Sequence, residues 1–269
     1  MGWWGKIVGG AVGFMAGGPI GAVLGAALGH RLDKGVERGE GGFSEVNFGG
    51  SSQERIQSVF FTTTFSVMGR IAKADGRVSK AEIDHATRVM ERMELTPEMR
   101  KTAMNLFEEG KKEDFPLDSV IGQFRKECQR RRNLMQMFLE IEFQAAYADG
   151  ELSESEAVLL RRIGEMLGFS AIELQAIGNR AKVGSGNFRG RAGAGSRQSS
   201  QSQLEDAYTL LGLPQTASFA EVKKSYRRLM SQHHPDKLVS KGLPEEMIRV
   251  AQEKTAEIRK AYEVIKDRQ

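Results

Sequence analysis

The strongest constraint on the fold is a long stretch without charge near the start of the chain. Residues 7–29 are 23 consecutive positions that lack Asp, Glu, Lys and Arg. A helix rises about 1.5 Å per residue, so this stretch is long enough to cross a hydrocarbon core of roughly 30 Å. Trp3 and Trp4 precede it, where aromatic rings favour the lipid headgroup level, and Lys6 can extend to the same level. The pattern predicts a transmembrane anchor.

The charges that flank this stretch indicate its orientation. Only Lys6 precedes it, whereas Arg31, Lys34 and Arg38 follow it closely. Because cytoplasmic flanks carry an excess of Lys and Arg, we expect a single-pass protein with its bulk in the cytoplasm and its N-terminus facing outward. A cleaved signal peptide and a loosely structured Gly/Ala segment are the alternatives. The signal peptide is disfavoured because its basic N-terminal cluster is absent and the apolar run exceeds the usual length.

Glycine recurs at every fourth position through the same stretch. A stripe of this kind lets two helix backbones approach closely and associate in lipid by van der Waals packing. We therefore expect a homodimer that forms through the transmembrane helix and contacts membrane lipid. The residues of the predicted dimer interface are Gly9, Gly13, Gly17, Gly21 and Gly25.

Two segments rich in Gly and Ser divide the rest of the chain. Segments of this composition bury too little apolar surface to offset the entropy lost on ordering, so both are interpreted as flexible linkers. The predicted parts are an anchor with its flanks at 1–34, a flexible linker at 35–52, a helical domain at 53–183, a disordered Gly/Ser/Arg linker at 184–203 and a second helical domain at 204–269.

Composition narrows the possible functions. Cys128 is the only cysteine, which excludes an internal disulfide framework and a Cys-cluster zinc site. The net charge of +4 is local, because residues 31–183 carry 23 basic against 25 acidic groups, whereas residues 184–203 carry +3. One short Arg/Gly element at residues 188–191 keeps an RNA-associated membrane protein as an alternative. We expect no nucleic-acid partner.

The central part of the chain contains an internal duplication. Residues 74–82 recur as residues 148–156 with an offset of 74, and the same offset relates Phe65 to Leu139. Apolar residues in both halves fall on helix faces rather than alternating as in strands. We expect two related helical hairpins.

The repeated turns allow two interpretations. In the first, each glycine ends a helix, and the Ser-x-x-Glu pattern at Ser79 and Ser153 forms a capping box that begins the next helix. In the second, four carboxylates meet and bind a divalent cation. The loops lack the full EF-hand spacing, which favours capping, and no other cofactor is expected. The candidate metal ligands are Asp75, Glu82, Asp149 and Glu156. Residues 55–180 resemble the TerB-like domain, an all-helical fold whose acidic turns are associated with metal binding.

The C-terminal part is predicted to form helices on either side of a loop. A short helix passes through Tyr208 and Leu211, and longer helices are predicted at about 218–232 and 244–266. On the first long helix Val222 and Leu229 share an apolar face that packs, opposite a basic face. The basic residues are Lys223, Lys224, Arg227 and Arg228. The other long helix closes the core with Ile258, Ala261, Tyr262 and Ile265.

The loop between the two long helices carries His234, Pro235 and Asp236. Pro235 fixes its own φ and restricts the residue before it, so the tripeptide is expected to stand at the tip of the loop. An ordinary helix stop and a metal site at His233 and His234 are the weaker interpretations. Four runs together resemble a DnaJ-type J-domain over residues 204–269: Tyr-Thr-Leu-Leu-Gly-Leu at 208–213, Lys-Lys-Ser-Tyr-Arg-Arg-Leu at 223–229, His-His-Pro-Asp-Lys at 233–237 and Ile-Arg-Lys-Ala-Tyr at 258–262.

The resemblance implies a function. In J-domains the His-Pro-Asp tripeptide stimulates ATP hydrolysis by a DnaK-type chaperone, and the basic helix docks on that partner's acidic surface. The layout as a whole resembles the membrane-anchored DnaJ-like co-chaperones of Gram-negative bacteria, which implies a single-pass protein of the bacterial inner membrane with a periplasmic N-terminus. It lacks the Gly/Phe region and the Cys-rich zinc domain of full-length DnaJ, so client binding through those parts is not expected.

Catalysis by the chain itself is not predicted. The sequence contains no Gly-rich phosphate loop, nucleophile elbow or His-Glu-x-x-His motif, so we expect no enzyme. The alternative function is a helical metal-sensing or envelope-stress signalling protein with an accessory J-domain.

Overall fold

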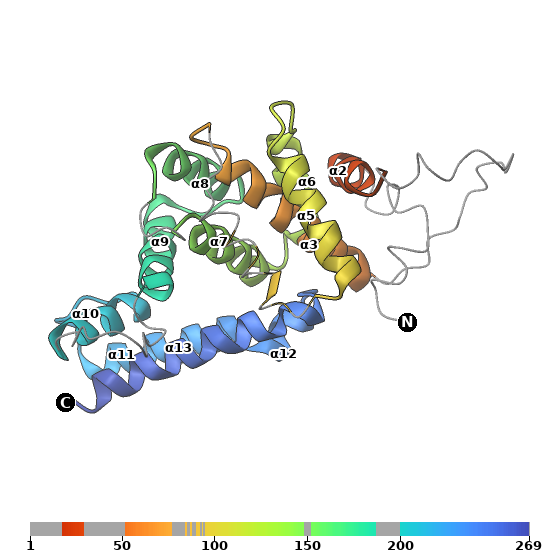
Figure 1. Cartoon of the computed structure of the whole chain (residues 1–269). Helices are drawn as coiled ribbons and strands as arrows, with labels where there is room; N and C mark the ends of the chain where they lie inside the picture. Colours follow the sequence, from red (N-terminus) through yellow and green to blue (C-terminus); the bar gives the residue numbers. More distant parts are fainter. Residues whose placement is uncertain are drawn as a thin grey trace, which may run out of the picture.

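The computed structural model describes residues 18–29, 52–76, 84, 87, 90–91, 93, 95–147, 152–186 and 200–268. These ranges contain helices and turns but no strand, which confirms the predicted all-α class (Figure 1). The central helices are α2 (Gly18–Gly29), α3 (Ser52–Ala72), α5 (Pro97–Gly110), α6 (Leu117–Cys128), α7 (Arg132–Ala146), α8 (Glu154–Met166) and α9 (Ala171–Gly186). The C-terminal elements are α10 (Ser200–Leu211), α11 (Phe219–His233), α12 (Pro235–Val239), the short 3₁₀ helix η3 (Glu245–Met247) and α13 (Ile248–Lys266).

Helix α3 is the centre of the main core. It is buried along most of its length because α2, α5, α6, α7 and α8 pack around it. Its aromatic side chains make edge contacts, such as the 4.9 Å between the ring centroids of Phe61 and Phe65. The buried hydroxyls of Thr64 and Ser66 donate to carbonyls one turn back at 2.8 Å, which satisfies them inside an apolar environment.

Two glycines bring α3 and α5 into backbone contact. A Cβ atom added at Gly69 would lie 2.0 Å from the carbonyl oxygen of Phe107, and one added at Gly110 would lie 1.7 Å from that of Ser66. No side chain fits at either position. The helix pair therefore crosses at a distance that only glycine permits.

The duplication is visible in the helices and extends beyond the predicted hairpins. The offset of 74 relates the first residue of α5, Pro97, to the first residue of α9, Ala171, so each repeat contains a further helix. Both helices are capped by a hydroxyl, from Thr96 and Ser170 respectively. Gly76 has a φ of 88°, the left-handed conformation expected of a glycine that ends a helix.

Helix α2 packs on the central domain against α3, α5 and α6. Its Ile20 and Leu24 are buried. The amide of Ile20 donates to Gln123 Oε1 at 2.9 Å, and Asn105 Nδ2 donates to the carbonyl of Ala27 at 2.8 Å. These bonds satisfy backbone groups that a helix leaves unpaired at its ends. In the part of the chain that the structure describes, no helix combines the length and the hydropathy needed to span a bilayer.

The predicted anchor is only partly described. Gly9, Gly13 and Gly17 lie outside the described residues, whereas Gly21 and Gly25 lie in α2. The predicted linkers, residues 35–52 and 184–203, are described only at their margins. Helix α3 begins at Ser52, the last residue of the first linker, and α9 and α10 both extend into the second linker.

The C-terminal domain is joined to the central domain along α13. Ile258, Ala261 and Ile265 pack with α10 and α11 in a separate small core, as predicted. Towards the start of the same helix, Val250 and Ala251 belong to the core of the central domain instead. Figure 1 shows α13 running from the α10–α11 pair to α12. The two domains are therefore in direct contact.

Candidate partner-binding site

The basic face of α11 is held by well-formed local structure. Ser218 caps the helix, and Glu221 completes a capping box by accepting from the Ser218 amide at 2.7 Å. All four predicted basic residues, Lys223, Lys224, Arg227 and Arg228, are exposed. Lys223 Nζ lies 4.5 Å from the ring centroid of Phe219, a cation–π contact one turn apart. The face therefore presents positive charge to solvent.

The fourth basic residue, Arg228, is exposed as well, and its guanidinium lies near Arg180 of the central domain. Its guanidinium donates to Ser225 Oγ at 3.2 Å and to Gln232 Oε1 at 3.4 Å. Partial burial, together with the positive charge of Arg180, lowers the pKa of Arg228. Arg228 is thus exposed on the predicted face while it also bonds to side chains of its own helix.

The His-Pro-Asp loop, residues 234–236, is a sharp turn between two helices. Helix α11 ends at His233, His234 is extended with a ψ of 123°, and Pro235 begins the five-residue helix α12. Pro suits the first position of a helix because its missing N–H would be unpaired there anyway. The side chains of His234 and Asp236 remain 49% and 91% exposed, and His234 Nδ1 lies 3.9 Å from Asp236 Oδ2. Both are available to a partner.

The chain just beyond the tripeptide is fixed to the central domain. Leu238 and Leu243 are fully buried in the central core. Gln53 Nε2 of α3 donates to the carbonyl of Val239 at 3.2 Å. A Cβ atom added at Gly242, which has a φ of 100°, would lie 2.6 Å from Ile56 Cγ2. One side of the predicted exposed loop is thus an interdomain contact.

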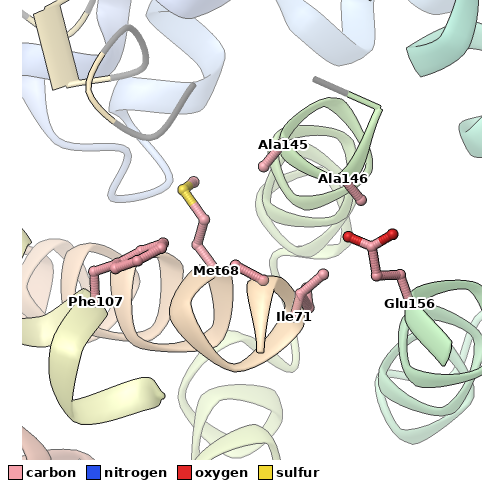
Figure 2. Close-up of a pocket in the computed structure, with 7 residues that line it drawn as sticks. Met68, Ile71, Phe107, Ala145, Ala146 and Glu156 are labelled. Atoms are coloured by element: carbon pink, nitrogen blue, oxygen red, sulfur yellow. The ribbon is translucent and has the colours of Figure 1, made fainter. Parts of the chain in front are cut away.

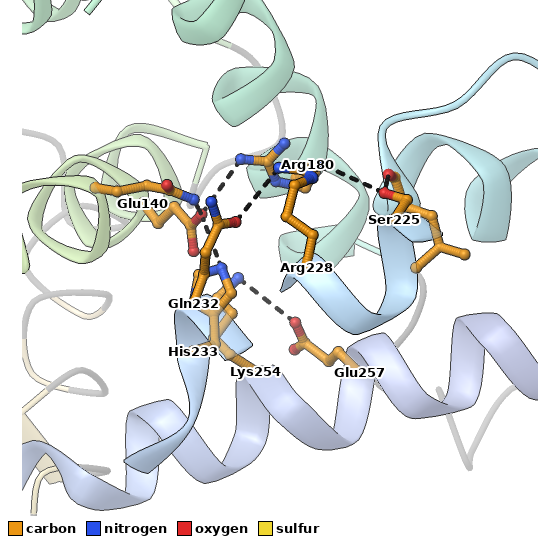
Figure 3. Close-up of polar contacts among 10 residues, drawn as sticks. Glu140, Arg180, Ser225, Arg228, Gln232, His233, Lys254 and Glu257 are labelled. Carbon is orange, nitrogen blue, oxygen red and sulfur yellow. Dashed lines mark hydrogen bonds and ion pairs between the residues drawn. The ribbon is translucent and has the colours of Figure 1, made fainter. Parts of the chain in front are cut away.

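The residue just before the tripeptide is also buried between the domains. His233 Nε2 lies 3.4 Å from Glu140 Oε1 of α7, and both side chains are only 4% exposed. The same oxygen accepts from Gln136 Nε2 at 3.0 Å and from Arg180 Nη2 of α9 at 3.4 Å. Figure 3 shows Glu140, Arg180 and His233 converging with two residues of α13, Lys254 and Glu257, whose side chains are 3.5 Å apart. We call these five residues, together with Gln136, the interdomain cluster.

Charge in the interdomain cluster is balanced around Glu140. Burial alone would raise the pKa of Glu140, but His233, Arg180 and Lys254, together with the hydrogen bond from Gln136, outweigh burial and lower the pKa to about 2. Burial lowers the pKa of His233, although Glu140 pulls it upward. Glu140 is therefore ionised at neutral pH and is the shared acceptor of the cluster.

The candidate metal ligands are not assembled in the described residues. Glu82 and Asp149 lie outside those residues, and Asp75 is exposed in the turn after α3. Glu156 forms the predicted capping box with Ser153, with both hydrogen bonds present. No group of three or more His, Cys, Asp or Glu side chains in the described ranges is placed to hold a metal ion. The four-carboxylate cation site stays a prediction.

Glu156 also borders a small cavity between α3, α7 and α8. Figure 2 shows its carboxylate directed towards Ala146 and Ile71, with Met68 and Phe107 further along the wall. The cavity has a volume of about 10 Å³, which is the size of one water molecule. It is too small for an organic cofactor or substrate.

Comparison with known proteins accounts for nearly the whole chain. Residues 1–39 match the family model described as the co-chaperone DjlA transmembrane domain, residues 62–179 match tellurite resistance protein TerB, and residues 206–269 match the DnaJ domain. Co-chaperone protein DjlA of Vibrio cholerae is 44% identical over 277 residues, covering 97% of this chain and 96% of the relative. Its counterpart in Salmonella typhimurium is 43% identical over 273 residues, covering 99% and 98%. No solved structure matches the chain.

The chain belongs to the DjlA co-chaperone family. This membership confirms the resemblances to a J-domain, to a TerB-like domain and to membrane-anchored DnaJ-like co-chaperones. The match to the DjlA transmembrane domain makes the chain a membrane-anchored member of the family.

Within this DjlA-family J-domain, sequence reasoning located the tripeptide and the basic face but missed the interdomain cluster. One signal was available. His233 continues the buried stripe of Val222, Ser225 and Leu229 on α11, so helical periodicity alone places it on the packed face. Glu140 stands within an apolar run of α7, where an acidic residue is unusual. Neither signal identifies the partner, because the two residues belong to different domains.

Proposed function

We propose that this chain stimulates ATP hydrolysis by a DnaK-type chaperone at the cytoplasmic face of the inner membrane. One observation carries the proposal: the exposed side chains of His234 and Asp236 lie at the end of α11, whose basic face is also exposed. Family membership supports the same partner class. The chain carries out no reaction of its own and acts on the partner's ATPase.

The arrangement divides recognition between two parts of the J-domain. Exposed charges on α11 attract an acidic partner surface over a distance and mainly raise the association rate. The His-Pro-Asp loop is a short, conformationally restricted contact, because Pro235 and the helix that it begins limit the backbone. The membrane anchor confines this activity to chaperones near the bilayer.

We further propose that the anchor spans the membrane once, with its N-terminus in the periplasm, and that it self-associates. In the bilayer, α2 leaves the packing against α3, α5 and α6 that the structure shows. The charge bias around residues 7–29 supports the orientation, and the glycine series supports the dimer. Each dimer then carries a pair of J-domains on the cytoplasmic side.

The test uses the full chain in lipid vesicles and a DnaK-type chaperone from the same bacterium. We expect the wild-type protein to raise the steady-state ATPase rate and His234→Gln to abolish the increase while circular dichroism stays unchanged. Ser240→Ala is the matched control, because Ser240 lies just beyond the tripeptide and its hydroxyl donates to the carbonyl of Lys237. A folded wild-type protein that leaves the ATPase rate unchanged would refute the proposal.

A further inference from the structure

The interdomain cluster joins the central domain to the residue that precedes the His-Pro-Asp loop. Glu140 Oε1 is shared by Gln136 of the same helix, by Arg180 of α9 and by His233 of the J-domain, at 3.0, 3.4 and 3.4 Å respectively. His233 Nδ1 and Arg180 Nε have no hydrogen-bond partner in the part of the chain that the structure describes. The contact of His233 with the central domain therefore depends strongly on one carboxylate.

Burial makes this contact difficult to replace. The side chains of Glu140 and His233 are 4% exposed, so water cannot substitute for either partner when the other is removed. Removing one partner of a buried charged contact is much more costly than removing one on the surface, because the remaining group stays desolvated and unpaired. Arg180, which is 11% exposed, would lose the same acceptor.

The position of His233 determines where the loop begins. His233 is the last residue of α11, and the chain turns at the next residue. Beyond the tripeptide, Gln53 of α3 donates a hydrogen bond to the Val239 carbonyl, and Leu238 is buried in the central core. These contacts hold the second flank of the loop. Both flanks of the loop therefore contact the central domain. The tripeptide between them faces outward.

We propose that Glu140 of the central domain is a positioning residue for the His-Pro-Asp loop, acting through His233, so that the central domain sets the efficiency of the J-domain. This inference rests on the proposed function. The docked arrangement presents the tripeptide, because His234 and Asp236 stay exposed while the chain on either side is buried. Loss of the contact allows the loop to sample orientations that do not engage the partner, which lowers the maximal effect.

The main variant is Glu140→Gln in the full chain, which keeps the shape of the side chain and removes its charge. The matched control is Glu142→Gln, the same substitution two residues further along α7. Glu142 is also fully buried, and its carboxylate has no hydrogen-bond partner among the described residues. His233→Gln is the second variant and alters the same contact from the J-domain side.

Two measurements are made on vesicle-bound full chain. The first is the dependence of chaperone ATPase rate on co-chaperone concentration. We expect Glu140→Gln to lower the maximal stimulation several-fold with little change in the half-saturating concentration, and Glu142→Gln to match wild type. The second is amide hydrogen exchange over residues 233–243. We expect exchange at least about tenfold faster in Glu140→Gln, which corresponds to about 1.4 kcal/mol.

A double variant tests whether Glu140 acts through His233. We expect Glu140→Gln combined with His233→Gln to be no worse than the stronger single variant, because both remove one contact. If Glu140→Gln does not fold, as judged by circular dichroism, His233→Gln provides the same comparison.

The outcomes separate this inference from the proposed function. Unchanged or increased maximal stimulation in a folded Glu140→Gln protein would overturn the positioning role, as would unchanged amide exchange over residues 233–243. A wild-type protein that fails to stimulate the ATPase would refute the proposed function instead, while the exchange measurement would still decide whether Glu140 holds the loop.

Discussion

Two glutamates on one helix show how environment decides the behaviour of a residue. Glu140 and Glu142 are both buried in α7. Positive groups surround Glu140, and its pKa falls to about 2. Burial raises the pKa of Glu142 well above its usual 4.5, because no compensating charge accompanies it. Glu140 therefore carries charge at neutral pH, whereas burial drives Glu142 towards its protonated form.

The two residues make stability depend on pH in opposite directions. Glu140 stabilises the folded state above its unfolded pKa, and this contribution is lost as the pH falls from about 4.5 to about 2. Glu142 behaves in the reverse way. The unfolded chain ionises Glu142 above about pH 4.5 while the folded chain keeps it protonated, so its contribution is lost as the pH rises.

Glu142→Gln is therefore expected to stabilise the protein at neutral pH. The amide cannot ionise, so the variant avoids a loss of up to about 1.4 kcal/mol for each pH unit between 4.5 and the raised pKa of the folded state. Urea unfolding of wild type and variant at pH 7 and pH 4.5 measures the effect. The advantage of the variant should shrink at the lower pH. An equal difference in stability at both values would show that Glu142 is not protonated in the folded protein.

At the scale of elements, α11 combines two functions on its two faces. Val222 and Leu229 are fully buried in the small J-domain core, so that face fixes the helix. The opposite face presents Lys223, Lys224 and Arg227. A helix held in this way offers its charges in a constant arrangement, which favours recognition of one acidic surface.

Reversing the exposed charges should weaken recognition more than stimulation. We expect the triple variant Lys223→Glu, Lys224→Glu and Arg227→Glu to raise the half-saturating co-chaperone concentration at least about tenfold at low salt and to flatten its salt dependence, because exposed charges mainly steer the encounter. ATPase titrations at two salt concentrations measure both effects.

A matched triple variant controls for net charge. Lys101→Glu, Lys126→Glu and Arg130→Glu change three exposed basic residues of the central domain by the same amount. This variant should behave like wild type. Equal effects from the two triple variants would show that total charge, rather than the face of α11, controls association.

At the scale of the whole molecule, the J-domain and the central domain form a continuous structure rather than two independent units. Leu238 and Val250 of the J-domain lie in the same apolar core as Phe65 of α3. The polar contact at Glu140 and this apolar contact lie on either side of the His-Pro-Asp loop. The arrangement makes the central domain part of the J-domain's support.

Self-association of the anchor is the prediction at this scale. We expect Gly17→Leu with Gly21→Leu to disrupt dimers, because bulky side chains separate helix backbones that must pack closely in lipid. Phe14→Leu with Leu24→Ile changes residues off the stripe and should leave dimers intact. Crosslinking of the full chain in membranes measures both pairs. If both pairs crosslink like wild type, the glycine stripe is not the interface.

The features that depend on local order can be predicted from the amino-acid sequence. Capping at Ser153 and Glu156, the left-handed Gly76 and the two faces of α11 each follow from residues within one or two helical turns. The duplication was visible for the same reason, since a repeated local pattern needs no knowledge of its neighbours. The third helix of each repeat was missed because the shared pattern weakens beyond the turn.

The contacts between the parts of the chain follow from the three-dimensional packing. Glu140 and His233 are far apart in the chain, and nothing local in either sequence indicates that they touch. The same applies to the proximity of Arg228 to Arg180 and to the packing of α2 on α5 and α6. Periodicity states which face of a helix is buried, but the identity of what covers that face depends on contacts between distant segments. The opposite protonation of two glutamates on one helix follows from those contacts alone.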